Sequence, residues 1–148
     1  MPYPDFVASA RVLDPRRLGK QRVEALQIIR ALTWPTYGWK HHPAVVMWQG
    51  CEEALGAYGV AVCEEWVRRG HGDTCEATMA ADLGTAGVPV PPRPQAGLAA
   101  AGALPEWLGD EALHRSHRSA LLRKDPEWYA RFFDDVPDDL PYVWPSKR

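Results

Sequence analysis

The sequence contains little cysteine and no long hydrophobic segment. Its three cysteines, at positions 51, 63 and 75, are odd in number and fit no zinc template, so we expect buried free thiols in a reducing compartment instead of a disulfide framework. No apolar run approaches the roughly 18 residues that a membrane span needs, and the first residues lack the basic and apolar regions of a secretory signal. These absences predict a cytoplasmic protein with no membrane partner.

Charge of one sign is also scarce, because the net charge is only −2. The charges are unevenly distributed, however. Residues 1–50 carry seven Lys and Arg against three acids, residues 51–110 carry three against nine, and residues 111–148 carry seven of each kind. A basic first third beside an acidic middle predicts a dipolar molecule with one face for an anion.

The 20-residue segment 13–32 is the clearest helix in the sequence. Asp14 is a good N-cap, and Pro15 suits the first helical position. At 100° per residue one face is apolar, while the other carries cations around Glu24, the only acid after the cap. One carboxylate among cations suits a site for a polyanion. The alternative is a solvated Lys20–Glu24 pair, which contributes about 0.3–0.5 kcal/mol.

Further elements follow from caps, periodicity and composition. Residues 1–6 favour an extended arm, and residues 33–42 form an aromatic loop whose rings either stack on bases or pack internally. A second helical region spans about 43–69, with a break near Gly50. The Pro-, Ala- and Gly-rich stretch at about 77–104 predicts a long loop. A helix near 110–124, a short helix from Pro126 and an extended C-terminal tail complete the chain.

The helix near 110–124 concentrates histidine and arginine, which favours phosphate binding over an ordinary solvated face. Two metal alternatives stay open. Cys63, His71 and Cys75 have ligand types that suit zinc, although their spacing matches no closed site. A His-based metal or phosphoryl-transfer enzyme would use four other histidines, namely His41, His42, His114 and His117.

Two motifs carry a family resemblance. Leu18 and Glu24 in LGKQRVEAL, followed near the end by Pro126, Trp128 and Tyr129 in DPEWYARF, resemble the pyrimidine-dimer DNA glycosylase family, in its actinobacterial branch. The resemblance implies an all-α protein with one compact domain over residues 1–148. That domain would contain three main helices, short helices, long loops, an extended N-terminal arm and a C-terminal tail.

The resemblance also implies a DNA-repair enzyme, a glycosylase with or without AP-lyase activity, that needs no cofactor or metal. An N-terminal amine would attack C1' of the damaged nucleotide while a carboxylate assists, which assigns the catalytic roles to Pro2, after excision of Met1, and to Glu24. Its partner would be double-stranded DNA with a damaged base, bound by a monomer in the cytoplasm near the nucleoid. The residues expected to bind this DNA are Arg17, Lys20, Arg22, His114, Arg115, His117, Arg118, Lys124, Trp128 and Tyr129. The alternative is an inactive nucleic-acid-binding protein of the same fold.

Overall fold

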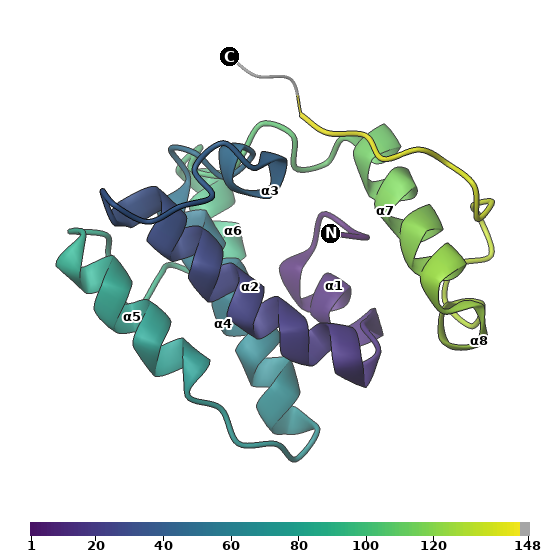
Figure 1. The fold of residues 1–148 in the computed structure, drawn as a ribbon, viewed down its shortest axis with the longest axis horizontal. Helices are drawn as coiled ribbons and strands as arrows, with labels where there is room; N and C mark the ends of the chain where they lie inside the picture. The colour runs from purple at the N-terminus through teal and green to yellow at the C-terminus, as the bar shows by residue number, and fades with distance from the viewer. Residues whose placement is uncertain (146–148) are drawn as a thin grey trace.

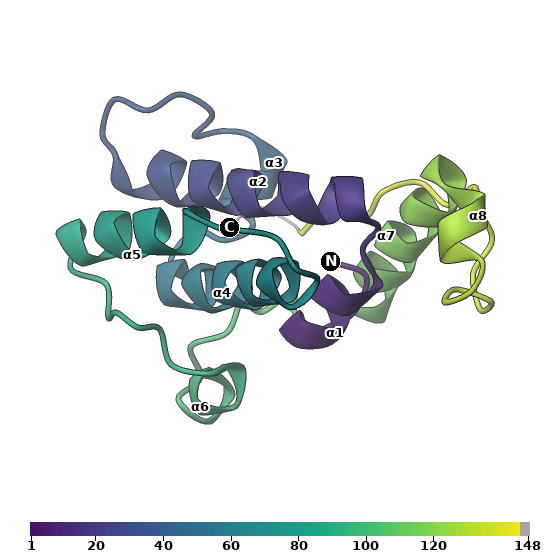
Figure 2. The same ribbon diagram turned by 90° about the horizontal axis from the view of Figure 1, so that it is seen from below.

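The computed structural model describes residues 1–145. The regular secondary structure of these residues is entirely helical. Helices α2, α4 and α5 pack against one another, and α1 lies against α4 (Figure 1). Helices α7 and α8 lie across the N-terminal segment from this group, as Figure 2 also shows. The elements are α1 (Phe6–Val12), α2 (Pro15–Thr33), α3 (Pro43–Val46), α4 (Glu52–Arg68), α5 (Cys75–Thr85), α6 (Gln95–Ala100), α7 (Glu111–Lys124) and α8 (Pro126–Tyr129). The predicted all-α, single-domain fold is confirmed.

Helix α2 begins where the sequence predicts. The Asp14 side chain accepts a hydrogen bond from the backbone N–H of Arg17 at 3.3 Å, and Pro15 occupies the first turn. Leu18, Ile28 and Ile29 are buried on the predicted apolar face. Glu24, Arg17 and Lys20 lie on the other side of the helix, away from this apolar face.

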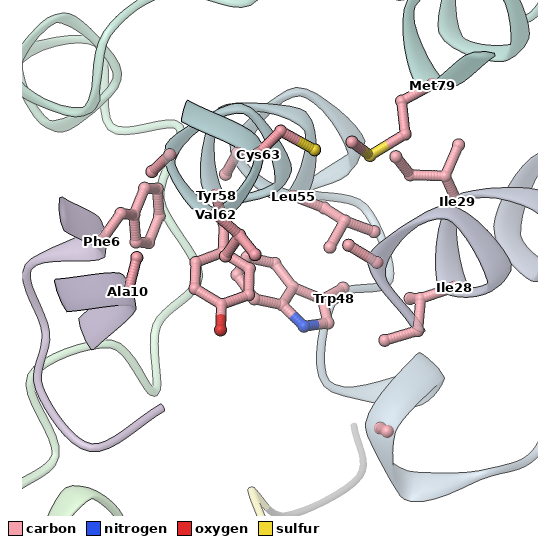
Figure 3. Packing of buried hydrophobic residues seen from close by; sticks show 14 of the residues in the cluster. Phe6, Ala10, Ile28, Ile29, Trp48, Leu55, Tyr58, Val62, Cys63 and Met79 are labelled. Carbon is pink, nitrogen blue, oxygen red and sulfur yellow. The ribbon is translucent and has the colours of Figure 1, made fainter. Parts of the chain in front are cut away.

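The core is an apolar cluster between α1, α2, α4 and α5 (Figure 3). Aromatic rings join α1 to α4 and the segment before it: the Phe6 and Tyr58 centroids are 5.6 Å apart, and those of Trp48 and Tyr58 are 5.8 Å apart. Gly59 allows α5 to approach α4 closely, because a Cβ there would lie 2.7 Å from Sδ of Met79. These contacts fix the positions of α2 and α4 behind the N-terminus.

The local structure differs from the prediction at 77–104 and at the N-terminal arm, and agrees with it at Gly50. The long loop at 77–104 is wrong in part, because α5 continues to Thr85 and α6 covers Gln95–Ala100; Met79, Leu83 and Leu98 supply enough buried apolar surface to hold both helices. The break near Gly50 is confirmed, since Gly50 has φ +82° between α3 and α4. The N-terminal arm ends earlier than predicted, with α1 starting at Phe6.

The cysteines and the helix lengths bear on two further expectations. Cys51, Cys63 and Cys75 are free thiols, as expected, although only Cys63 is fully buried. Within residues 1–145 no helix combines the length and the hydrophobicity that crossing a membrane requires.

Candidate active site

A cavity of about 650 Å³ opens between α2, α3, α7 and the C-terminal tail, and the N-terminus lies in it. Part of its wall is the apolar core. The charged part contains four cations and one carboxylate among the described lining residues. Besides Met1 at the N-terminus, the polar and aromatic lining residues are Arg16, Arg17, Lys20, Gln21, Glu24, Trp48, Tyr58, His117, Lys124, Tyr142 and Trp144.

The amine of residue 1 is buried in this cavity. Its nitrogen lies 2.6 Å from Nδ1 of His117. Burial lowers the pKa of this amine from 8.0 to about 5, and the nearby negative charge of Glu24 opposes that shift. An amine with this pKa is uncharged at neutral pH, which is the state that a nucleophile requires.

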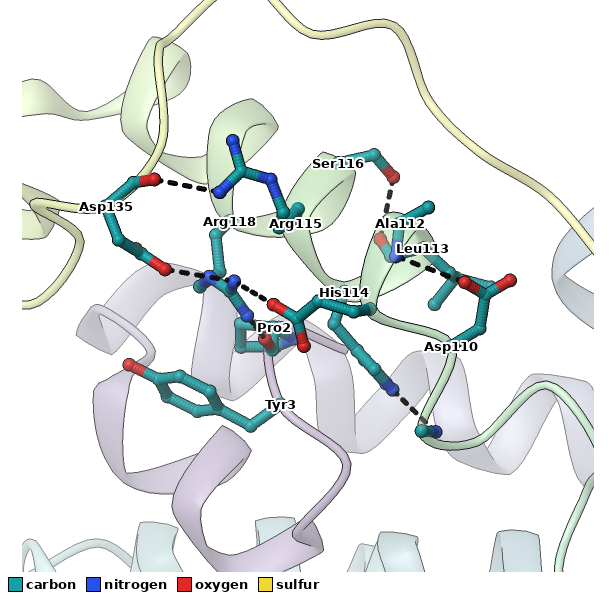
Figure 4. A network of polar contacts seen from close by, with 12 residues as sticks. Pro2, Tyr3, Asp110, Ala112, Leu113, His114, Arg115, Ser116, Arg118 and Asp135 are labelled. Carbon is teal, nitrogen blue, oxygen red and sulfur yellow. Dashed lines mark hydrogen bonds and ion pairs between the residues drawn. The ribbon is translucent and has the colours of Figure 1, made fainter.

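Helix α7 holds the first two residues of the chain through buried side chains. Nδ1 of His114 lies 2.9 Å from the carbonyl oxygen of Met1, and the backbone N–H of Gly109 donates to Nε2 of the same ring at 3.0 Å. The ring proton must therefore be on Nδ1, which donates to Met1. Nη1 of Arg118 donates to the carbonyl oxygen of Pro2 at 2.9 Å, in the network of Figure 4. Three residues of one helix, counting His117, thus position the N-terminal segment.

Glu24 reaches the same cavity from α2, with Lys20 one turn and Arg17 two turns before it on the same face. Its charge is close enough to influence both the residue 1 amine and Tyr58, whose pKa is raised by burial and by Glu24. Lys124 approaches from α7. Of the predicted site residues, the structure brings together Glu24, Arg17, Lys20, His117 and Lys124.

Four of the predicted polar DNA ligands lie outside the cavity lining and have protein partners. Arg22 pairs with Asp73 and lies over the Trp66 ring, with its guanidinium carbon 4.4 Å from the ring centroid. Arg115 donates to a backbone carbonyl of the tail at 2.9 Å. His114 and Arg118 are 0% and 4% exposed and bind the N-terminal segment. Both side chains are buried, hold the N-terminal segment and lie outside the cavity lining, and their binding to phosphate stays a prediction.

Trp128 and Tyr129 lie outside the cavity lining, although both are among the residues expected to bind the DNA. The Tyr129 hydroxyl donates to Oδ1 of Asp14 at 2.5 Å and accepts from the Asp14 backbone N–H at 3.0 Å. Nε1 of Trp128 donates to the Val12 carbonyl at 2.8 Å. Tyr129 therefore attaches α8 to the start of α2, and Trp128 attaches α8 to the end of α1. Tyr129 is fully buried, and contact of either ring with a base stays a prediction.

The sequence interpretation missed aromatic residues that do line the cavity. Tyr142 and Trp144 of the tail pack edge-on against His117, with centroids 5.6 Å and 5.9 Å away. The same contacts attach the tail to α7. Tyr58 belongs to the apolar stripe of α4, so no periodic pattern marks its position at the cavity. The sequence feature that could have indicated these cavity residues is the pair of aromatic side chains in a tail otherwise rich in proline and acidic residues.

Neither of the two metal sites considered from the sequence is formed in residues 1–145. In that part of the chain no group of three or more His, Cys, Asp or Glu is placed to hold an ion. The His71 ring stacks on Trp66 at 3.9 Å. His42 caps α3 by accepting from the backbone N–H of Ala44 at 3.1 Å. The histidines thus serve separate local roles.

Comparison with known proteins gives one match. A family model described as pyrimidine dimer DNA glycosylase matches residues 1–79, a range that contains the N-terminal segment, α1, α2 and α4. No curated protein and no solved structure matches the chain. Glu24 and the N-terminus lie inside the matched range, whereas α7 lies outside it.

Proposed function

The chain belongs to the pyrimidine dimer DNA glycosylase family, whose model covers more than half of it, and from this premise we propose that it excises a damaged base from double-stranded DNA through an N-terminal amine. The family is one of DNA-repair glycosylases. The nucleophile would be the secondary amine of Pro2 after excision of Met1, and Glu24 would be its acid–base partner. The observation that carries the proposal is that one cationic cavity holds both the buried N-terminus and Glu24.

The chemical steps can be assigned to these two groups. The lone pair of the amine attacks C1', the bond between C1' and the base breaks, and its electron pair leaves with the base, which takes a proton from solvent. Glu24 accepts the proton that the attacking nitrogen loses. When the sugar ring opens, the electron pair of the C1'–O4' bond moves to O4', which receives that proton from Glu24, and the nitrogen lone pair forms an iminium. Glu24, now a carboxylate again, takes a C2' proton; the electron pair of that C–H bond forms an enamine with the iminium carbon and then expels the 3' phosphate, which leaves with the C3'–O electron pair and cuts the strand.

The cations around the cavity suit the backbone of the DNA. Arg17, Lys20 and Lys124 line the cavity and would each neutralise a phosphate, giving an affinity that falls with salt and depends little on sequence. Tyr142 and Trp144 offer aromatic surface to a base that has left the stack. The cations at the rim would hold the phosphates, while the buried amine and the carboxylate of Glu24 would act on the sugar.

The test is borohydride trapping. Wild-type protein is incubated with duplexes that contain a cyclobutane pyrimidine dimer or an abasic site, and intact mass shows both the covalent adduct and the N-terminal residue. We expect an adduct on a chain that starts at Pro2. Glu24→Gln should lower the trapping rate by about 10²–10⁴-fold, the usual contribution of general acid–base catalysis, with unchanged DNA affinity.

Glu64→Gln is the matched control, because Glu64 is an exposed carboxylate of α4 outside the cavity lining. It should trap at the wild-type rate. If wild type binds the duplexes but forms no adduct and releases no base, the protein is a DNA-binding member of the family without the chemistry. If an adduct forms on a chain that retains Met1, the assignment of the amine to Pro2 is wrong.

A further inference from the structure

The acyl group of Met1 occupies the space directly next to the nitrogen of Pro2, inside the cavity. Its carbonyl oxygen accepts the Nδ1–H of His114 at 2.9 Å, and its amine lies 2.6 Å from His117. Removal of Met1 converts the Pro2 amide nitrogen into an amine whose lone pair points to where the Met1 carbonyl carbon had been. The substrate carbon that Pro2 attacks must come to that same place.

The amide carbon of Met1 and C1' of the adduct are bonded to the same kinds of neighbour. The carbonyl carbon of Met1 is bonded to the Pro2 nitrogen, to one oxygen and to one carbon. In the covalent adduct, C1' is bonded to the same nitrogen, to the ring oxygen O4' and to C2'. The Met1 carbonyl carbon therefore stands in for C1', and its oxygen stands in for O4'.

We propose that the Nδ1–H of His114 donates a hydrogen bond to O4' of the sugar attached to Pro2, and so assists the opening of the ring. This inference rests on the proposed function, since it requires Pro2 as the nucleophile. As the C1'–O4' bond breaks, its electron pair moves to O4', and a fixed donor stabilises the charge that develops there. The proton that completes the hydroxyl still comes from Glu24.

His114 is built as a fixed neutral donor. The N–H of Gly109 occupies Nε2 at 3.0 Å, which holds the proton on Nδ1, and the side chain is 0% exposed. Burial is the main cause that lowers the pKa of this imidazole, so it stays uncharged at neutral pH. A neutral buried N–H suits an ether oxygen, whereas phosphates are met by the exposed cations at the rim. Orientation without charge is what a ring-opening donor requires.

Two amide variants separate the nitrogens of the ring. His114→Asn keeps an N–H donor at the position of Nδ1, and His114→Gln reaches the position of Nε2, where it keeps the contact with Gly109 but loses the donor. Each variant is used as the full chain, with its folding checked by thermal unfolding. Single-turnover trapping is measured with an abasic duplex, whose sugar is mainly a closed ring, and with propanal, a linear aldehyde that has no ring to open.

On the abasic duplex we expect His114→Gln to trap about 10²-fold more slowly than wild type, the usual cost of removing one donor to a developing oxyanion, and His114→Asn to stay within a few-fold of wild type. With propanal all three proteins should react at equal rates. Equal rates on the abasic duplex would overturn the proposal. A loss that is the same on propanal would make His114 a positioning residue for Pro2 only, and a loss of equal size in both variants would refute the assignment of the donor to Nδ1.

The outcome for wild type keeps the two proposals apart. If wild type reacts with propanal but with neither the abasic nor the dimer duplex, the proposed function fails before His114 is tested. If neither variant folds, the Nδ1–H resonance of His114 in ¹⁵N-labelled wild type must shift when the abasic adduct is trapped. An unchanged resonance would overturn the proposal.

Discussion

Replacing Arg118 with Lys tests whether this cation holds the N-terminus or binds DNA. The substitution keeps a positive charge but loses the planar group that donates to several partners at once. In the folded protein Arg118 donates to the Pro2 carbonyl at 2.9 Å, to Glu111 at 2.6 Å and to Asp135 at 3.2 Å, and it lies over the Tyr3 ring. A single ammonium group cannot make all of these contacts.

The size of the effect follows from burial. The contact with Pro2 is buried and involves a charged donor, so its loss costs about 1.5–3 kcal/mol. Glu111 and Asp135 have side chains that are 65% and 55% exposed, so each of these ion pairs adds at most about 1 kcal/mol. A total of about 1.5–5 kcal/mol should lower Tm by roughly 3–20 °C for a chain of this size.

The rate of adduct formation should fall by more than the fraction of Arg118→Lys that unfolds at the assay temperature can explain. A displacement of Pro2 by about 1 Å is enough to lower the rate of adduct formation by about 10²-fold. We expect Arg118→Lys to trap propanal and abasic DNA more slowly by the same factor, because the nucleophile itself is displaced. DNA affinity and its salt dependence should stay at the wild-type value.

Lys20→Ala provides the matched comparison, since Lys20 is exposed and lines the cavity. Its loss should reduce the slope of log K against log salt by about 0.9, the contribution of one phosphate contact, and should leave the reaction with propanal unchanged. If Arg118→Lys behaves as Lys20→Ala is expected to, or traps at the wild-type rate with an unchanged Tm, the assignment of Arg118 to the N-terminal segment is refuted.

Three further predictions concern stability. Tyr129→Phe removes the hydrogen bond to the Asp14 carboxylate and should lower the free energy of unfolding in urea by about 2 kcal/mol at pH 7. Burial opposes ionisation of Asp14, but its hydrogen bonds hold its pKa below 3.8. This stabilisation should therefore be lost as pH falls below 3.8, and the difference between wild type and variant should shrink. His117→Asn should weaken the fall of the free energy of unfolding with acid pH. Burial lowers the pKa of His117 from 6.5 to about 2, so between these values only the unfolded chain takes up this proton. Wild type should lose about 2 kcal/mol more than the variant between about pH 6.5 and 5, and parallel pH profiles of the two proteins would contradict this. Gly59→Ala would place a Cβ 2.7 Å from Sδ of buried Met79 and should lower the free energy of unfolding by about 1–3 kcal/mol, whereas a neutral result would show that Met79 can move away.

The helical pattern of α2 could be predicted because its causes are local. The N-cap at Asp14, Pro15 in the first turn and the apolar period act within a few residues of the chain. The same period places Glu24 on the polar face with Arg17 and Lys20, and these three residues line the cavity. The loop predicted at 77–104 failed for the opposite reason, because α5 and α6 depend on burial against other helices.

By itself, the sequence therefore determined the helical class, the start of α2 and the group of charges around Glu24. Only the tertiary structure decided which of the other cations line the cavity and which are held by distant partners. Arg22 meets Asp73 from 51 positions away, and Arg118 meets Pro2 from 116 positions away. Such partners are set by how the whole chain folds back on itself, and local periodicity carries no information about them. The same long-range packing buries the amine beside His117, and burial is what lowers its pKa.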